Sequence, residues 1–147
     1  MQDLQTKLTA QPINQKDIFH NAIKISYRLE ENMLVVFVMG KRSFEDSHYY
    51  WQKVIEICEE NNIENVQITL ALRGKYTPFD SIKNYQQMID FVKPFDINVA
   101  LIDLNGLSKK DSQIACNMAS SQGMNCSYFD NELKARYWLN QFSLETA

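Results

Sequence analysis

The periodicity of hydrophobic and polar positions changes along the chain, and each periodicity predicts one kind of secondary structure. Across residues 22–30, apolar and polar side chains alternate, which is typical of a half-buried strand. Residues 31–32 are read as a tight turn, and residues 33–40 are almost continuously apolar. Because only a short turn separates the two strands, we expect an antiparallel hairpin whose second strand is buried on both faces.

Helix-type periodicity follows in several segments. Ser43 is expected to cap a helix that runs to about Asn62, because its hydroxyl can accept a hydrogen bond from a free backbone N–H. A second helix follows Thr77-Pro78, and a third follows Ser108 and ends near Gly123. The spacing predicts these buried faces, in the order of the three helices: Trp51, Val54, Ile55 and Cys58; Ile82, Tyr85, Ile89 and Val92; Ile114, Ala115 and Met118.

Further strands are predicted between these helices, at residues 66–72, 97–102 and 125–129, and a last helix at about residues 130–142. The order β-β-α-β-α-β-α-β-α predicts a single α/β domain with a mixed five-stranded sheet and four helices. The first hairpin should be antiparallel, and the helical connections should make the remaining strands mainly parallel. Residues 1–21 are expected to form a loose N-terminal arm, and residues 22–143 the folded domain.

The last helix is expected to dock on the sheet. Ala135, Trp138, Leu139 and Phe142 follow the spacing i, i+3, i+4 and i+7, which places them on one face. Burial of a large aromatic side chain and its neighbours contributes on the order of several kcal/mol. We therefore interpret Trp138 as a core residue, with stacking on a ligand as the alternative.

Residues 118–139, MASSQGMNCSYFDNELKARYWL, resemble the C-terminal part of small bacterial proteins with a STAS-like fold. STAS stands for the sulfate-transporter and anti-sigma-factor antagonist domain. The positions that carry the resemblance are Gly123, Phe129, Asp130, Ala135, Trp138 and Leu139.

This resemblance implies a regulatory protein without enzymatic activity, in a group where many members have no assigned function. Its best-understood members are switched by phosphorylation of a serine that follows an aspartate near the start of the second helix. The corresponding stretch here, LALRGKYTPFDSIK, has no Asp-x-Ser at the strand end, although Thr77 and Ser81 lie nearby.

Composition and charge limit the classes that remain. The chain has 147 residues, of which 45% are hydrophobic and 22% charged, as in a single globular domain. A net charge of −3 argues against general nucleic-acid binding. No apolar run suits membrane insertion and no secretory signal is recognised, so we expect a cytoplasmic protein. Cys58, Cys116 and Cys126 lack the close spacing of zinc ligands, and we expect reduced thiols.

Basic residues gather in three loops that should share one edge of the sheet. The loops comprise residues 40–42, 73–75 and 103–110, and each leads into a helix N-terminus. Ligands of open α/β sheets bind at the carboxyl ends of the strands, and helix N-termini suit anions. The candidate site for an anion or an acidic partner consists of Arg42, Arg73, Lys75, Thr77, Ser108 and Lys109. The alternative is that these side chains are simply solvated.

Enzyme motifs such as G-x-S-x-G, the P-loop, G-x-G-x-x-G and H-E-x-x-H are absent from the sequence. We therefore predict no catalytic residues, no metal and no cofactor. The first hypothesis is a non-enzymatic regulatory or protein-interaction module with a protein partner. The alternative is a protein that binds a small anionic ligand, such as a nucleotide, a lipid or a phosphate metabolite. A homodimer through Tyr49, Tyr50 or the hairpin edge is a further hypothesis.

Overall fold

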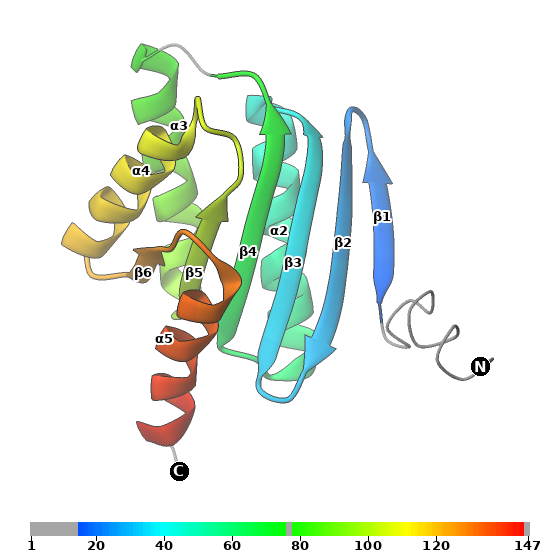
Figure 1. Cartoon of the computed structure of the whole chain (residues 1–147), viewed down its shortest axis with the longest axis vertical. Coiled ribbons are helices and arrows are strands. Elements are labelled where there is room, and N and C mark those ends of the chain that lie inside the picture. Colours follow the sequence, from blue (N-terminus) through cyan, green and yellow to red (C-terminus); the bar gives the residue numbers. More distant parts are fainter. Residues whose placement is uncertain (1–14, 76–77, 146–147) are drawn as a thin grey trace.

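The structure is a computed structural model that describes residues 15–75 and 78–145. Figure 1 shows one twisted sheet with helices on both of its faces. The strands are β1 (Lys16–His20), β2 (Ile23–Glu30), β3 (Met33–Lys41), β4 (Asn65–Arg73), β5 (Asn98–Asp103) and β6 (Asn125–Tyr128). The helices are α2 (Phe44–Asn61), α3 (Pro78–Val92), α4 (Lys109–Ser121) and α5 (Glu132–Glu145), with one turn of 3-10 helix at Lys93–Phe95.

The predicted α/β class, mixed sheet and four helices are confirmed, but the described sheet has six strands and not five. The additional strand is β1, which lies within the segment that we expected to be loose. It pairs antiparallel with β2, from Lys16 opposite Tyr27 to His20 opposite Ile23. Its residues show no alternation, because an edge strand with a largely exposed surface needs few apolar side chains, and pairing with β2 determines its structure.

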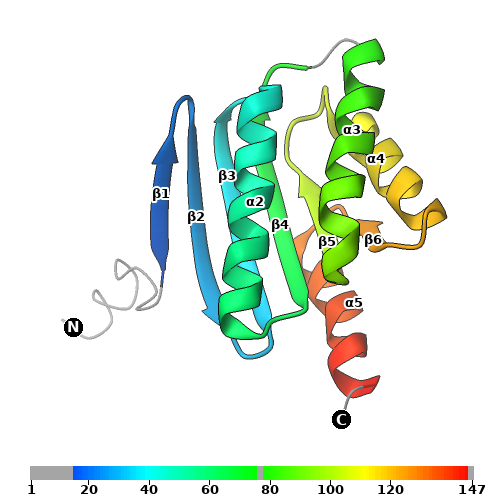
Figure 2. The same ribbon diagram turned by 180° about the vertical axis from the view of Figure 1, so that it is seen from behind.

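The strands lie side by side in chain order, from β1 to β6. The pairs β1–β2 and β2–β3 are antiparallel, whereas β3–β4, β4–β5 and β5–β6 are parallel, as expected for strands joined through helices. The carboxyl ends of β3, β4 and β5 therefore share one edge of the sheet. This edge carries the N-termini of α2, α3 and α4 (Figures 1 and 2).

Two layers of helices complete the core. Helices α2, α3 and α4 cover one face of the sheet, where the larger cluster of buried side chains includes Val54, Ile68 and Val92 (Figure 2). Helix α5 covers the other face, where Ala135 and Leu139 are fully buried. The predicted docking of the last helix is confirmed. None of the helices described has both the length and the apolarity that crossing a membrane requires.

The predicted cap of α2 is confirmed, whereas Ser108, the residue before α4, makes no capping hydrogen bond with its side chain. The Ser43 hydroxyl accepts a hydrogen bond from the backbone N–H of Asp46 at 3.1 Å and so caps α2. The Ser108 side chain donates instead to a carboxylate oxygen of Asp103 at 2.9 Å. The Ser108 hydroxyl bonds to the Asp103 carboxylate and not to a helix N–H, because hydrogen bonds to a charged acceptor are stronger than those between neutral groups.

The predicted buried faces of α3 and α4 are wrong in part. Ile82 is 59% exposed and Ile114 is 42% exposed. The buried residues of these helices include several polar and small side chains: Ser81, Asn84, Met88, Ile89 and Val92 in α3, and Ser112, Cys116 and Ala119 in α4. Apolar spacing locates a helix face well only when the face is entirely apolar. Here the faces that point inward also carry polar side chains, two of which, Asn84 and Ser112, line the cavity described below.

Candidate functional site

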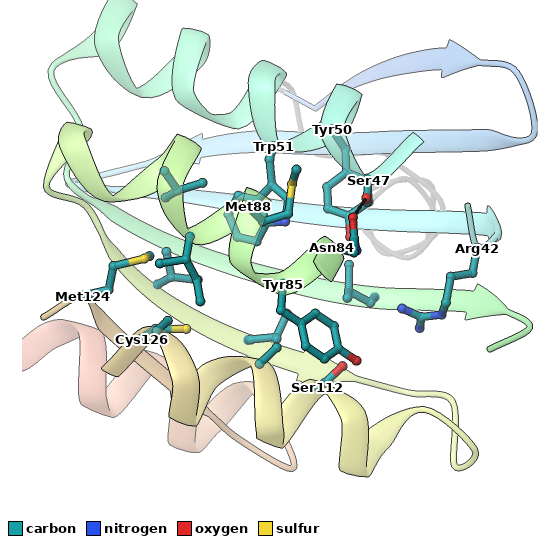
Figure 3. A pocket seen from close by; sticks show the side chains of 17 residues that line it. Arg42, Ser47, Tyr50, Trp51, Asn84, Tyr85, Met88, Ser112, Met124 and Cys126 are labelled. Atoms are coloured by element: carbon teal, nitrogen blue, oxygen red, sulfur yellow. Dashed lines mark hydrogen bonds between the residues drawn. The ribbon is translucent and has the colours of Figure 1, made fainter. Parts of the chain in front are cut away.

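A cavity of about 90 Å³ lies between helices α2, α3 and α4 and the sheet (Figure 3). One buried water needs roughly 10–15 Å³ of such space, so the cavity has room for several non-hydrogen atoms. Its lining includes Leu70, Ile89, Val99 and Leu101, which come from β4, α3 and β5. These side chains make most of the wall apolar.

One end of the cavity is polar. Arg42, Ser47, Asn84 and Ser112 line it there, and the ring of Tyr85 points along the cavity toward this end (Figure 3). The Ser47 hydroxyl donates to the backbone oxygen of Phe44 at 2.8 Å and lies 3.2 Å from Oδ1 of Asn84. The polar end thus combines hydroxyl and amide groups that are anchored on α2, α3 and α4.

A buried carboxylate organises the polar end. Asp103 ends β5 with a side chain that is 0% exposed, and one of its oxygens accepts from Ser108 at 2.9 Å and from Ser112 at 2.6 Å. The same oxygen lies 3.5 Å from Nη2 of Arg42, whose side chain is 8% exposed. The other carboxylate oxygen of Asp103 accepts a hydrogen bond from the backbone N–H of Asn105 at 2.9 Å. The buried guanidinium charge is therefore compensated by the protein itself.

Arg42 also joins the loops that form the edge. Its Nε donates to the backbone oxygen of Gly74 at 3.2 Å, and its Nη2 donates to the Ser108 hydroxyl at 2.9 Å. The loop after β3 is thereby fixed to the loops after β4 and β5. These contacts make Arg42 primarily a residue that positions the edge.

The six predicted site residues have different surroundings. Arg42 and Ser108 come together in the buried network around the Asp103 carboxylate. Arg73 and Lys75 lie on the surface as exposed side chains. Thr77 lies outside the described residues. The structure thus buries the Arg42 side chain, whereas Arg73 and Lys75, which flank its hydrogen-bond partner Gly74, stay exposed.

The sixth residue, Lys109, lies on the surface and forms an ion pair. Its Nζ is 2.8 Å from a carboxylate oxygen of Asp130. This hydrogen bond raises the pKa of Lys109 and lowers the pKa of Asp130. The charge of Lys109 is therefore shared with a neighbouring acid, which weakens its attraction for an external anion.

Ser81, the described candidate for phosphorylation, is buried. Only 5% of it is exposed, near the start of α3. A kinase would need local unfolding of α3 to reach this hydroxyl. The accessible candidates for modification therefore do not include Ser81.

Sequence reasoning missed Asp103, Ser112 and Asn84. A weak signal was present, since an aspartate ends an otherwise apolar strand and Ser108 and Ser112 have the i, i+4 spacing of one helix face. The hydrogen bonds from Ser108 and Ser112 to Asp103 form only when α4 packs beside the end of β5.

Comparison with known proteins does not place the chain in a family, because the sequence matches no protein-family model and no curated protein. Functional reasoning therefore rests on the cavity, the buried network and the surface around them. The STAS-like resemblance stays a hypothesis.

Proposed function

We propose that this protein is a non-catalytic binding protein that holds a small apolar molecule with one uncharged polar end. The supporting observation is the lining of the cavity, which is apolar along most of its length and polar at the Arg42 end. Small-molecule sites typically combine an apolar wall with a few polar groups that fix the orientation of the ligand. The apolar part of the ligand would lie against Leu70, Val99 and Leu101, and its polar end would face Ser112 and Arg42.

The buried network favours an uncharged polar end over an anion. The Asp103 carboxylate lies 3.5 Å from Arg42 and carries the opposite charge. Because Asp103 already balances the charge of Arg42, a ligand anion would lose its hydration in the cavity without meeting an uncompensated cation. A hydroxyl or carbonyl group makes hydrogen bonds at the same place at a smaller desolvation cost. The proposal therefore modifies the sequence-based hypothesis of an anionic ligand.

The serines at the polar end support binding and not covalent catalysis. The hydroxyl groups of Ser108 and Ser112 both donate hydrogen bonds to the Asp103 carboxylate. A nucleophilic serine needs a base that accepts its proton during attack, most often a histidine. His20 stacks on Tyr49 with ring centroids 3.6 Å apart, and His48 contacts Phe91. Neither histidine lines the cavity.

Filling the cavity should abolish ligand binding. Ala115 lines the cavity from α4, so Ala115→Leu would place a larger side chain in the space that the ligand occupies. The matched control is Gln113→Leu, which adds leucine at an exposed position of the same helix. We expect 1-hexanol and 1-octanol to raise the thermal midpoint of the wild type and of the control, but not of Ala115→Leu.

The same measurement tests the charge of the ligand. At pH 7, the alcohols should raise the midpoint more than hexanoate and octanoate at equal concentration, because only the carboxylates must lose the hydration of a full charge beside an Arg42 that Asp103 already neutralises. No shift with any of these four compounds, or equal shifts for Ala115→Leu and Gln113→Leu, would refute the proposed cavity site.

A second candidate, a regulatory or protein-interaction module, is favoured by the surface beside the cavity. Leu104 is 58% exposed and Leu107 is 75% exposed, in the loop after β5. The Asn105 side chain donates to the backbone oxygen of Leu72 at 2.8 Å, which places this loop beside the exposed Arg73 and Lys75. Exposed leucines next to cations suit a partner surface that carries both acidic and apolar side chains. This candidate agrees with the STAS-like resemblance.

Charge reversal should separate this candidate from non-specific attraction. The double variant Arg73→Glu and Lys75→Glu reverses the charge of two exposed cations at the edge. The control Lys16→Glu and Lys93→Glu changes the net charge equally at exposed positions near the opposite edge. With a fluorescent peptide of alternating glutamate and leucine as the probe, the first variant should bind about tenfold more weakly than the wild type. Equal binding by both variants would exclude the edge as the docking surface.

A further inference from the structure

Two of the three cysteines meet in the structure, although ten positions separate them in the sequence. Sγ of Cys126, on β6, lies 3.2 Å from Sγ of Cys116, on α4. Both residues have free thiols. We propose that Cys116 and Cys126 form a redox modification site, at which two thiols convert reversibly into a disulfide between α4 and β6. This inference does not depend on the proposed function.

The local fold holds the two sulfur atoms in reach of each other. Helix α4 packs directly on β6, and the connection between them is short. The backbone N–H of Met124 donates to the oxygen of Ala119 at 3.0 Å, and the Ser120 hydroxyl donates to the oxygen of Cys126 at 2.6 Å. A disulfide needs its sulfur atoms about 2.05 Å apart. The two sulfur atoms are therefore about 1 Å further apart than in a disulfide.

Exposure of the two thiols determines the order of the steps. Cys126 is half-buried on the strand, whereas Cys116 is 2% exposed beneath it. The contact with the Cys126 sulfur and burial raise the pKa of the Cys116 thiol, which keeps it protonated while Cys126 reacts first. An external reagent therefore meets Cys126 before Cys116.

The exchange can be written with a small disulfide such as oxidised glutathione. The Cys126 thiol loses its proton, and its sulfur attacks one sulfur of glutathione disulfide, so that one glutathione thiolate leaves. The Cys116 thiol then loses its proton and attacks Sγ of Cys126, which releases the second glutathione. In total, two protons and two electrons pass from the cysteine pair to the reagent, which becomes two glutathione thiols.

Cys58 provides an internal control. It lies on α2, is 3% exposed, and has a thiol whose pKa burial raises to about 12. An external reagent does not reach a buried thiol of this kind, and Cys58 is not one of the two cysteines whose sulfur atoms meet. Cys58 should remain reduced under conditions in which the pair is oxidised.

The full-length protein, first reduced, is equilibrated in glutathione buffers of increasing oxidised fraction. It is then denatured, alkylated and weighed by mass spectrometry. We expect one alkylated thiol at Cys58, a mass deficit of two hydrogens at the pair, and a peptide linked through Cys116 and Cys126. Because the disulfide joins α4 to β6, the oxidised protein should melt about 5 °C higher than the reduced one.

Single variants test the order of the steps. Cys116→Ser should trap glutathione on Cys126 as a mixed disulfide, because the second thiol is missing. Cys126→Ser should leave Cys116 unmodified, and Cys58→Ser should behave as the wild type. Three alkylated thiols in fully oxidised glutathione would overturn the proposal. Crosslinks through Cys58, or glutathione on Cys116 in the Cys126→Ser variant, would overturn it as well.

Discussion

Truncation of the chain after Asp130 should yield a protein without a cooperative unfolding transition. The truncation removes α5, whose Ala135 and Leu139 are 0% exposed against the sheet. It also removes Trp138, whose ring packs on Phe129 at a centroid distance of 5.6 Å. Since a whole domain is stable by only about 5–15 kcal/mol, loss of one of its two helical layers should leave too little burial to maintain a unique core.

The sheet residues that α5 covers add to the stability lost on truncation. Ile102 of β5 and Val35 of β3 belong to the cluster that α5 covers, and both would face water in the truncated chain. Burial of such side chains contributes roughly 1.5–3 kcal/mol each. Differential scanning calorimetry on the truncated protein should show no heat-absorption peak near the wild-type midpoint, and a peak within a few degrees of it would contradict the prediction.

A matched pair of point variants tests the same layer without truncation. Leu139→Ala should lower the free energy of unfolding by about 2–5 kcal/mol, because it leaves a cavity at a fully buried position. Leu133→Ala, in the same helix, affects a residue that is 81% exposed and should cost less than about 0.5 kcal/mol. Urea denaturation measures both values, and similar losses in the two variants would mean that α5 does not dock as described.

Replacement of Asp103 with alanine should be the most damaging single polar substitution among those considered. The Asp103 carboxylate is fully buried and faces the Arg42 guanidinium, which is 8% exposed. Removal of one partner leaves a buried charge without compensation, at a cost of about 3–5 kcal/mol. Ser108 and Ser112 would lose their acceptor at the same time. Asp103→Asn should cost less, because the amide oxygen still accepts hydrogen bonds.

A double-mutant cycle isolates the contribution of the ion pair. Arg42→Met and Asp103→Leu should each destabilise the protein, and the double variant should be less destabilised than the sum of the two by about 2 kcal/mol or more. Urea denaturation at neutral pH gives the four free energies of unfolding. Additive effects, or an Asp103→Ala variant within about 1 kcal/mol of the wild type, would show that the buried pair does not stabilise the loops.

The local signals in the sequence predicted several elements correctly. Ser43 caps α2 as expected, and Asn62 ends it with a left-handed φ of 54°, which asparagine tolerates. The spacing of Ala135 and Leu139 identified the buried face of α5, because that face is apolar throughout. These features depend on residues close together in the chain, so their physical causes are visible in a short window.

Sequence patterns gave no answer or a wrong one where a distant partner decides the outcome. In β4, Gln67 and Thr69 alternate with apolar residues, a pattern typical of a strand with one solvated face. Both are nevertheless buried, at 0% and 2% exposure, on the face that α5 covers. Likewise β1 becomes a strand through its pairing with β2, and Ile82 stays exposed although its spacing suits a core position.

The sequence by itself determined the order of the elements from β2 onward, the parallel central strands and the docking of the last helix on the sheet, because periodicity and capping act over a few residues. Only the tertiary structure decided which reactive and polar groups meet. It pairs the charge of Arg42 with Asp103, forms a cavity between three helices and the sheet, and places the sulfur atoms of Cys116 and Cys126 3.2 Å apart. Each of these features joins residues on different elements, and their separation in space is set by how the layers pack.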